Sequence, residues 1–288
     1  MVWHAGEVEL QRLAGSQELL ARVGPRVIRP FMPTQHRAFF EELPFFVLGG
    51  LDADARPWAT LRAGPPGFLR APDDTHLSFD AESDPTDPLD LRVGDAVGLL
   101  GIQPHTRRRN RANGRVEARE GATTTVVVMQ SFGNCPKYIM PREARFEPRR
   151  TGRVRLEVRS GLDDEARSLI SGADTFHVAS SFDGHVDVSH RGGPAGFVEL
   201  HDSGRLRIPD YAGNRFFNTL GNLIRNPAAG LLFLEWDQGH ALHLSGRVTV
   251  DLRPTTDAQR HWSFTPRCVL WRRHAVPLRW RHGALKPT

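Results

Sequence analysis

Cysteine and long hydrophobic runs are scarce in this 288-residue chain. The two cysteines, Cys135 and Cys268, are too few for a disulfide framework, and their spacing fits no CxxC metal or redox motif. No apolar run is long enough for a membrane helix, and the first residues lack the basic start and apolar stretch of a secretory signal. We therefore expect a cytoplasmic protein without a membrane partner.

Lysine is also nearly missing, because it stands only at positions 137 and 286 although lysine and arginine together number 38. The net charge of +5 thus comes from arginine, a bias typical of a GC-rich genome. The densest cluster, at 107–111, lies in a predicted strand whose successive side chains point to opposite faces. Two interpretations of this cluster stay open: a solvated basic face, or a role at an interface or cofactor site. The absence of interleaved aromatics disfavours nucleic acid as a partner.

Several motifs of nucleotide and metal sites are absent as well. Neither GxGxxG nor GxxxxGK occurs, which disfavours a Rossmann or P-loop site. The 13 histidines show no HExxH motif and no paired ligand spacing, so no metal site is predicted. His190, His240 and His243 are accordingly expected to be surface or sheet residues.

The sequence does contain a hidden duplication, in which residues 45–116 recur as residues 174–248. Matching residues recur with the same spacing: Asp54, Arg62, Gly64, Pro65, Gly67 and Phe68 in the first copy, and Asp183, Arg191, Gly193, Pro194, Gly196 and Phe197 in the second. The tripeptides Gly98-Leu99-Leu100 and Gly114-Arg115-Val116 likewise return as Gly230-Leu231-Leu232 and Gly246-Arg247-Val248. Two copies predict two similar domains in one chain.

Each copy shows the same predicted order of elements. A short helix opens it, at 35–43 and 163–170, and is followed by strands that include 45–50 and 175–180. About six mostly antiparallel strands per copy indicate a mainly β fold, a small closed β-barrel with flanking helices. We predict an N-terminal helix over 4–22 within a segment 1–33, a first barrel at 34–150, a second at 151–260 and a C-terminal tail at 261–288, with a connector at 141–155.

The copies differ most in one segment. In the first copy residues 80–90 contain five acids and no base, whereas the matching stretch 209–223 carries Arg215. A helix starting near Asn214 would place Arg215, Asn218, Thr219 and Asn222 on one polar face. An arginine, small polar donors and a helix N-terminus form a phosphate site, which Arg191 could close. The alternative is an Asn-capped surface helix.

The second copy resembles the pyridoxamine 5'-phosphate oxidase-like family of FMN-binding split β-barrels. The resemblance rests on the stretch from Asp187 to Arg191, the Asn214-Arg215 to Asn222 segment, the Asn226-Pro227 turn and the strand at 230–233, and it extends more weakly over both copies, roughly residues 34–255. It implies two tandem split barrels that form an intrachain pseudo-dimer, with FMN between them. Whether the fused pair forms a further homodimer stays open.

The resemblance also implies which residues hold the flavin. The predicted FMN residues of the second copy are Ser189, Arg191, Asn214, Arg215, Asn218, Thr219 and Asn222. The first barrel would have a degenerate flavin site and would reach across with Arg107, Arg109 and Asn113. No basic set for a second phosphate occurs near the C-terminus, so vitamin B6 oxidation is not favoured.

One further segment concentrates rare residue types. Cys135, Lys137 and Tyr138 lie together, which indicates a substrate or flavin contact, with a buried thiol beside a turn proline as the alternative. The predicted function is an FMN-dependent oxidoreductase that acts on an unidentified small molecule, with a reduced nicotinamide, NAD(P)H, or a small organic molecule as electron donor. The alternative is a non-catalytic flavin or heme binder serving as sensor or carrier, in which His177 or His190 would ligate heme.

Overall fold

Two antiparallel sheets, built in the same way, form most of the protein. The computed structural model describes residues 2–80, 84–148, 153–253 and 260–282. The first sheet contains, in hydrogen-bonded order, β2 (Pro57–Ala63), β1 (Phe45–Leu51), β5 (Ala96–Gln103), β6 (Arg108–Glu120), β7 (Thr123–Gly133), β4 (His76–Asp80) and β3 (Leu69–Arg70). The second contains β11 (His185–Gly192), β10 (Thr175–Phe182), β14 (Ala228–Glu235), β15 (His240–Asp251), β16 (Arg260–Arg273), β13 (Leu206–Asp210) and β12 (Glu199–Leu200), with β9 (Arg155–Arg159) paired to β16.

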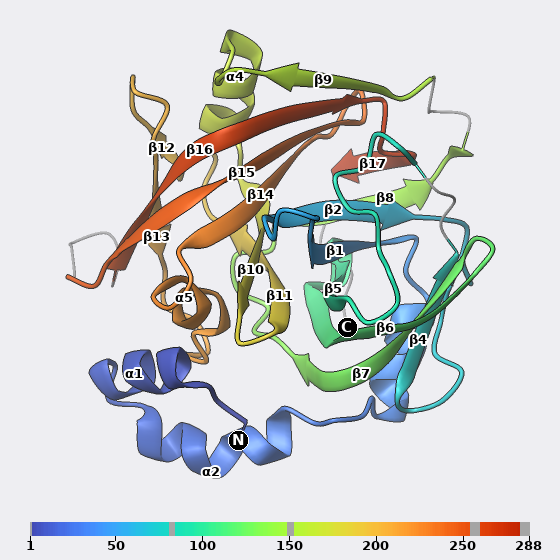
Figure 1. Ribbon diagram of the computed structural model, residues 1–288, viewed down its shortest axis with the longest axis vertical. Coiled ribbons are helices and arrows are strands. Elements are labelled where there is room, and N and C mark those ends of the chain that lie inside the picture. Colours follow the sequence, from blue (N-terminus) through green and yellow to red (C-terminus); the bar gives the residue numbers. More distant parts are fainter. Residues whose placement is uncertain (1, 81–83, 149–152, 254–259, 283–288) are drawn as a thin grey trace.

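The strand order reproduces the duplication element by element. β1 lies between β2 and β5, and β10 lies in the same way between β11 and β14. Figure 1 shows the two sheets side by side, the second in warm colours and the first in blue and green. The prediction of two tandem, mainly β units is therefore confirmed. In the described residues hydrogen bonds close neither sheet into a ring, so each barrel is split and not the closed form expected from the strand count.

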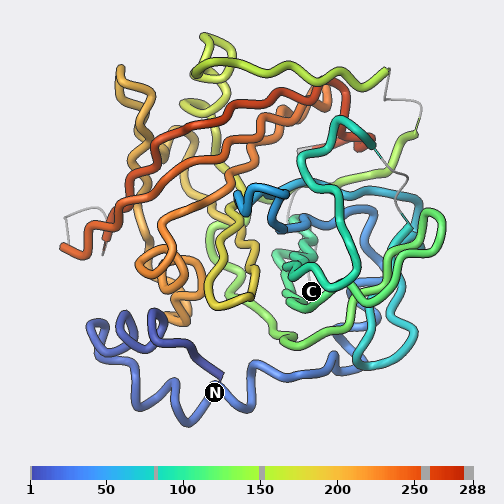
Figure 2. The backbone as a smooth tube through the Cα atoms, in the orientation of Figure 1, coloured from blue at the N-terminus to red at the C-terminus, as the bar shows by residue number. Residues whose placement is uncertain are grey.

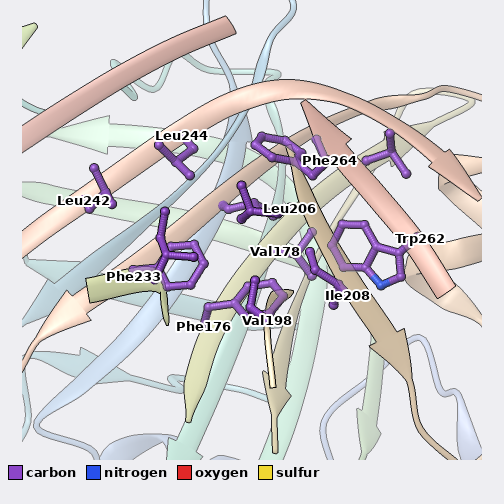
Figure 3. Close-up of a cluster of buried hydrophobic side chains, with 14 of the residues drawn as sticks. Phe176, Val178, Val198, Leu206, Ile208, Phe233, Leu242, Leu244, Trp262 and Phe264 are labelled. Carbon is purple, nitrogen blue, oxygen red and sulfur yellow. The ribbon is translucent and has the colours of Figure 1, made fainter. Parts of the chain in front are cut away.

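Strand β1 is apolar throughout because both of its faces are covered. Along β1, Phe46 and Leu48 enter the core of the first unit, while Phe45 and Val47 face a third cluster between the units. Strand β14 alternates in the same way between the core of the second unit, drawn in Figure 3, and that shared cluster. A strand that is buried on two faces reads as a continuous hydrophobic run.

The repeated Gly-Leu-Leu tripeptides mark where the units touch. A Cβ atom added to Gly230 on β14 would lie 2.3 Å from the carbonyl oxygen of Pro57 on β2. On the other side, a Cβ at Gly98 would lie 3.0 Å from the backbone nitrogen of Val188 on β11. Each unit thus brings one glycine against the backbone of its neighbour, which gives the interface an approximate two-fold symmetry.

The N-terminal segment joins the two units at one end of the molecule (Figure 2). It forms two helices, α1 (Ala5–Leu13) and α2 (Gln17–Val27), where the sequence predicts a single helix over 4–22. The break lies at Gly15, whose φ of 62° suits glycine. Helix α1 then crosses α5 (Asn218–Leu223) so closely that a Cβ at Gly6 would lie 2.1 Å from the carbonyl oxygen of Gly221.

The remaining elements are three short helical segments and a small two-stranded sheet. They are α3 (Thr34–Glu41), the 3-10 turn η1 (Pro104–Thr106), α4 (Asp164–Gly172) and a small sheet of β8 (Arg142–Phe146) with β17 (Leu278–His282). The predicted connector at 141–155 thus contains β8, and its residues 149–152 lie outside the described part. Strand β16 carries the second sheet to Arg273, into the predicted tail. No helix in the described part is long and apolar enough to cross a membrane.

Candidate functional site

A polar cavity lies where the first unit meets the second. The first unit lines it with Arg109 and Arg111 of β6 and with residues from Asn134 to Tyr138. The second unit contributes the end of β11, from Ser189 to Gly192, and much of the loop before and into α5. The antiparallel alternation of β6 places Arg109 and Arg111 on the same face, which explains why both reach this cavity.

A buried ion pair holds the two units together at the cavity floor. Nη1 of Arg111 donates to both carboxylate oxygens of Asp187 at 2.9 Å, and Nη2 donates to Oγ of Ser189. Ser189 also shares a hydrogen bond of 2.6 Å with the hydroxyl of Thr219 at the start of α5. Because both charged side chains are more than nine-tenths buried, this pair neutralises itself and positions β6, β11 and α5 with respect to one another.

Arg109 fixes the protonation state of a neighbouring histidine. Its Nη1 lies 2.9 Å from Nδ1 of His190. A guanidinium group only donates, so Nδ1 is the acceptor and the hydrogen of the neutral imidazole resides on Nε2. Burial, followed by the charge of Arg109, lowers the pKa of His190 well below its ordinary value. His190 is therefore a neutral hydrogen-bond donor that lines the cavity.

The cavity carries more positive charge than the protein neutralises. Arg191 pairs with Asp210 at 2.8 Å, as Arg111 does with Asp187. Within the described ranges, the other three cations of the lining, Arg109, Lys137 and Arg215, form no ion pair with a carboxylate. Burial, and then the charge of Arg111, lowers the pKa of Arg109 to about 9. Such an arrangement favours an anionic ligand.

The loop before α5 is built differently from the prediction. The helix begins at Asn218, not near Asn214, because Arg215 and Phe217 both have left-handed backbone angles, with φ of 60° and 63°. Asn214 instead accepts a hydrogen bond of 3.2 Å from the backbone nitrogen of Phe216 and shapes the turn. Arg215 therefore lies on a strained loop at the cavity and not on a helix face.

Most of the predicted site residues meet at this cavity. Its lining includes, from the predicted set, Arg109, Cys135, Lys137, Tyr138, Ser189, Arg191, Asn214, Arg215, Asn218 and Thr219. Asn218 is already engaged, because its amide donates to Glu7 at 2.6 Å and its carbonyl oxygen accepts from Arg111 at 3.3 Å. The contact with Glu7 comes from helix α1, which the sequence did not connect to the site.

Three predicted residues lie away from the lining. Arg107 is exposed, and its left-handed backbone (φ 55°) puts it before β6. Asn113 is buried and donates to Asp187 at 3.3 Å, so it supports the ion pair. Asn222 is also buried, and its amide donates to Oγ of Ser180 at 3.0 Å. None of the three lines the cavity: Arg107 precedes β6, Asn113 shares the face of Arg109 and Arg111 but lies two residues further along β6, and Asn222 turns toward Ser180. Their contact with a ligand therefore stays a prediction.

Several residues of the cavity lining were not predicted as site residues, among them four with polar side chains. Arg111, Asn134, Asp210 and Tyr211 line the cavity, and Tyr211 stacks on Tyr138 with ring centroids 5.1 Å apart. The chain has only two tyrosines, so their meeting could not be inferred from composition but is visible at once in the fold. For Arg111 a signal existed: it is two residues from Arg109 in a predicted strand.

The buried histidines do not form a metal centre in the described part of the chain, where no group of three or more His, Cys, Asp or Glu side chains could hold a metal ion. His190 and His243, expected at the surface or in a sheet, are both buried within strands. His177 lies against His190 with ring centroids 5.7 Å apart, and burial followed by the charge of Arg109 lowers its pKa to about 3.

The duplicated split barrels, which share a polar cavity, define the class of fold. A family model described as pyridoxamine 5'-phosphate oxidase matches residues 32–159 and again residues 162–275. The chain therefore belongs to the pyridoxamine 5'-phosphate oxidase family, in a tandem form, and the resemblance inferred from the sequence is confirmed. No curated protein matches the sequence significantly.

Several solved structures are similar to less than half of the chain. A FAD-binding protein from Mesorhizobium loti is 14% identical and covers 42% of this chain and 99% of its own, with a TM-score of 0.30. A protein related to general stress protein 26, of the pyridoxinephosphate oxidase family, from Clostridium acetobutylicum is 14% identical over 41% of this chain and 92% of its own, with a TM-score of 0.29. HupZ of Group A Streptococcus is 16% identical over 35% of this chain and 94% of its own, also with a TM-score of 0.29.

Proposed function

We propose that the chain binds FMN in the cavity between its two units and is an oxidoreductase that acts on a small molecule. The observation that carries the proposal is the surplus of positive charge on Arg109, Lys137 and Arg215, at an inter-unit cavity of a pyridoxamine 5'-phosphate oxidase family member. The phosphate of a mononucleotide supplies the negative charge that would balance these three cations.

The residues of the loop and of β11 fit the phosphate end of such a ligand. Arg215, Asn214 and Thr219 of the loop and α5 line the cavity together with Arg191 and Ser189 of β11, and the hydroxyls of Ser189 and Thr219 are hydrogen-bonded to each other. Among these, the charged hydrogen bonds from the arginines contribute most of the affinity. Arg191 is shared with Asp210, so a bound phosphate would compete with that carboxylate for the guanidinium group.

Arg109 and His190 of the lining offer donors for developing negative charge. When bound, FMN supplies the electron transfer, and a reduced nicotinamide or a small organic molecule supplies the electrons. His190 presents its Nε2 hydrogen without carrying a charge, because Arg109 holds the other ring nitrogen. The cationic Arg109 beside it favours any state of the ligand that gains negative charge.

The experiment is a titration of the purified protein with FMN, with the bound flavin released by denaturation and counted. We expect one flavin per chain. Replacing Arg215 by alanine removes a charged hydrogen bond of about 1.5–3 kcal/mol, so the Kd for FMN should rise about 10- to 150-fold. The Arg205→Ala variant removes an exposed arginine outside the cavity and should bind as the unaltered protein does.

Activity assays and absorption spectra distinguish the proposed oxidoreductase from the alternative, a non-catalytic flavin or heme binder. NAD(P)H oxidation by the FMN-loaded protein, or reoxidation of photoreduced flavin in air, would support an oxidoreductase over a passive flavin carrier. Absorption bands of heme instead of flavin, or Arg215→Ala binding FMN with unchanged Kd, would contradict the proposal.

A further inference from the structure

The first unit has its own counterpart of the phosphate end of the cavity. On β2, Thr60 pairs with Leu48 and Arg62 pairs with Phe46. On β11, Ser189 pairs with Val178 and Arg191 with Phe176, which are the matching positions of β10. Thr60 and Arg62 therefore stand in the first unit where Ser189 and Arg191 stand in the second.

The opposite unit contributes in both places. Arg272 on β16 lies two residues after Leu270, which pairs with His243 of β15. Asn134, which lines the cavity, lies likewise two residues after Phe132, the partner of Arg111 on β6. Arg272 thus reaches into the first unit from the position at which Asn134 reaches into the second.

A carboxylate of the chain lies at the centre of this counterpart. Oδ2 of Asp87 accepts hydrogen bonds from the hydroxyl of Thr60 at 2.7 Å, from Arg62 at 2.5 Å and from Arg272 at 2.9 Å. Two guanidinium groups and a hydroxyl converging on one oxygen are a donor set that suits phosphate. Asp84 accepts a hydrogen bond from Nη2 of Arg272.

Asp87 is held firmly in its charged form. Its side chain is 2% exposed, and its other oxygen accepts from the backbone nitrogen of Leu89 at 2.9 Å. Burial acts to raise the pKa of Asp87, but the charges of Arg62 and Arg272 outweigh it and keep that pKa well below its usual range. The segment of the second unit that corresponds to Asp87 is the stretch from Gly213 to Leu220, which contains no acid.

We propose that the first unit retains a phosphate-type anion site and that the chain's own Asp87 carboxylate occupies it. Asp87 of the acidic segment thus takes the position of an external anion. Occupation of this site by Asp87 extends the proposed function, because it explains why one flavin per chain is expected. The evidence for the occupied anion site is independent of flavin, since it consists of the contacts of Asp87.

The proposal predicts that removal of the carboxylate opens the site to an external anion. A cavity of about 280 Å³, lined among others by Arg62, Asp84 and Asp87, adjoins the carboxylate and leaves space for a phosphate ion. In the Asp87→Ala variant, Arg62 loses its only carboxylate among the described residues, and Arg272 keeps only Asp84. A buried, uncompensated charge of this kind destabilises the fold.

The test is chemical rescue followed by thermal unfolding, on the full chain saturated with FMN. Asp87→Ala should lower the Tm by about 10 °C, and inorganic phosphate should restore about half of that loss, whereas chloride at equal ionic strength should not. The unaltered protein is measured in parallel, because phosphate also has access to the other cavity. The readout is the rise in Tm with phosphate in the variant beyond the rise in the unaltered protein. The double variant Arg62→Ala with Asp87→Ala should lose that extra rise.

Should Asp87→Ala not fold, Asp87→Ser leaves similar space and carries the same expectation. An equal response of variant and unaltered protein to phosphate would overturn the proposal, and so would an extra rise that persists without Arg62. Failure of the protein to bind FMN would refute the proposed function but would leave this test intact, since the rescue is then measured without flavin.

Discussion

The buried pair of Arg111 and Asp187 gives a quantitative test of how the two units are joined. Both side chains are less than one-tenth exposed, and the contact spans the boundary between β6 and β11. Charge centres about 4 Å apart attract by about 4 kcal/mol at an effective dielectric constant of 20. Removal of one partner also leaves the other buried and unpaired, so Arg111→Met should lower the free energy of unfolding by about 3–5 kcal/mol.

A double-mutant cycle separates the pair from its surroundings. Asp187→Asn alone should destabilise by a similar amount, and the double variant should be less destabilised than the sum of both by about 3 kcal/mol. Urea unfolding at pH 7 measures each step. The exposed pair of Arg70 and Asp80 is the matched control, with side chains 42% and 44% exposed and an expected coupling below about 1 kcal/mol. Additive effects at Arg111 and Asp187, within about 0.5 kcal/mol, would refute the reasoning.

Two more predictions concern the contacts that hold the site in place. Burial raises the pKa of Glu7 to about 7 from 4.5, so the folded state binds its proton more tightly, and stability should fall by about 3 kcal/mol as the pH rises from about 4.5 to about 7. The difference in unfolding free energy between the unaltered protein and Glu7→Gln should follow that slope in urea titrations, and a flat difference would contradict it. Gly230→Ala should destabilise by about 1–3 kcal/mol, because its Cβ meets Pro57. Gly161→Ala, with open space around it, should stay within about 0.5 kcal/mol, and equal losses for both would show that the units do not touch there.

The sequence alone predicted the duplication, the order of elements along each copy and the family, because these follow from local patterns and from spacing. The pairing order within each sheet and the division of the N-terminal segment into α1 and α2 appeared only in the structure. Even Arg109 and Arg215 could be placed near the candidate site, because one lies in a cluster within a strand and the other in the segment where the copies diverge. These inferences rest on period and position along the chain.

Only the tertiary structure decided which side chains face the cavity and which anion the first unit holds. Arg107 lies just before β6 and Asn222 faces Ser180, and neither outcome follows from composition, because side-chain direction depends on where a strand or helix begins. The contact of Asp87 with Arg272 joins residues far apart in sequence and in different units. Such a pair forms only when both sheets have folded against each other, so no local pattern in the chain contains it.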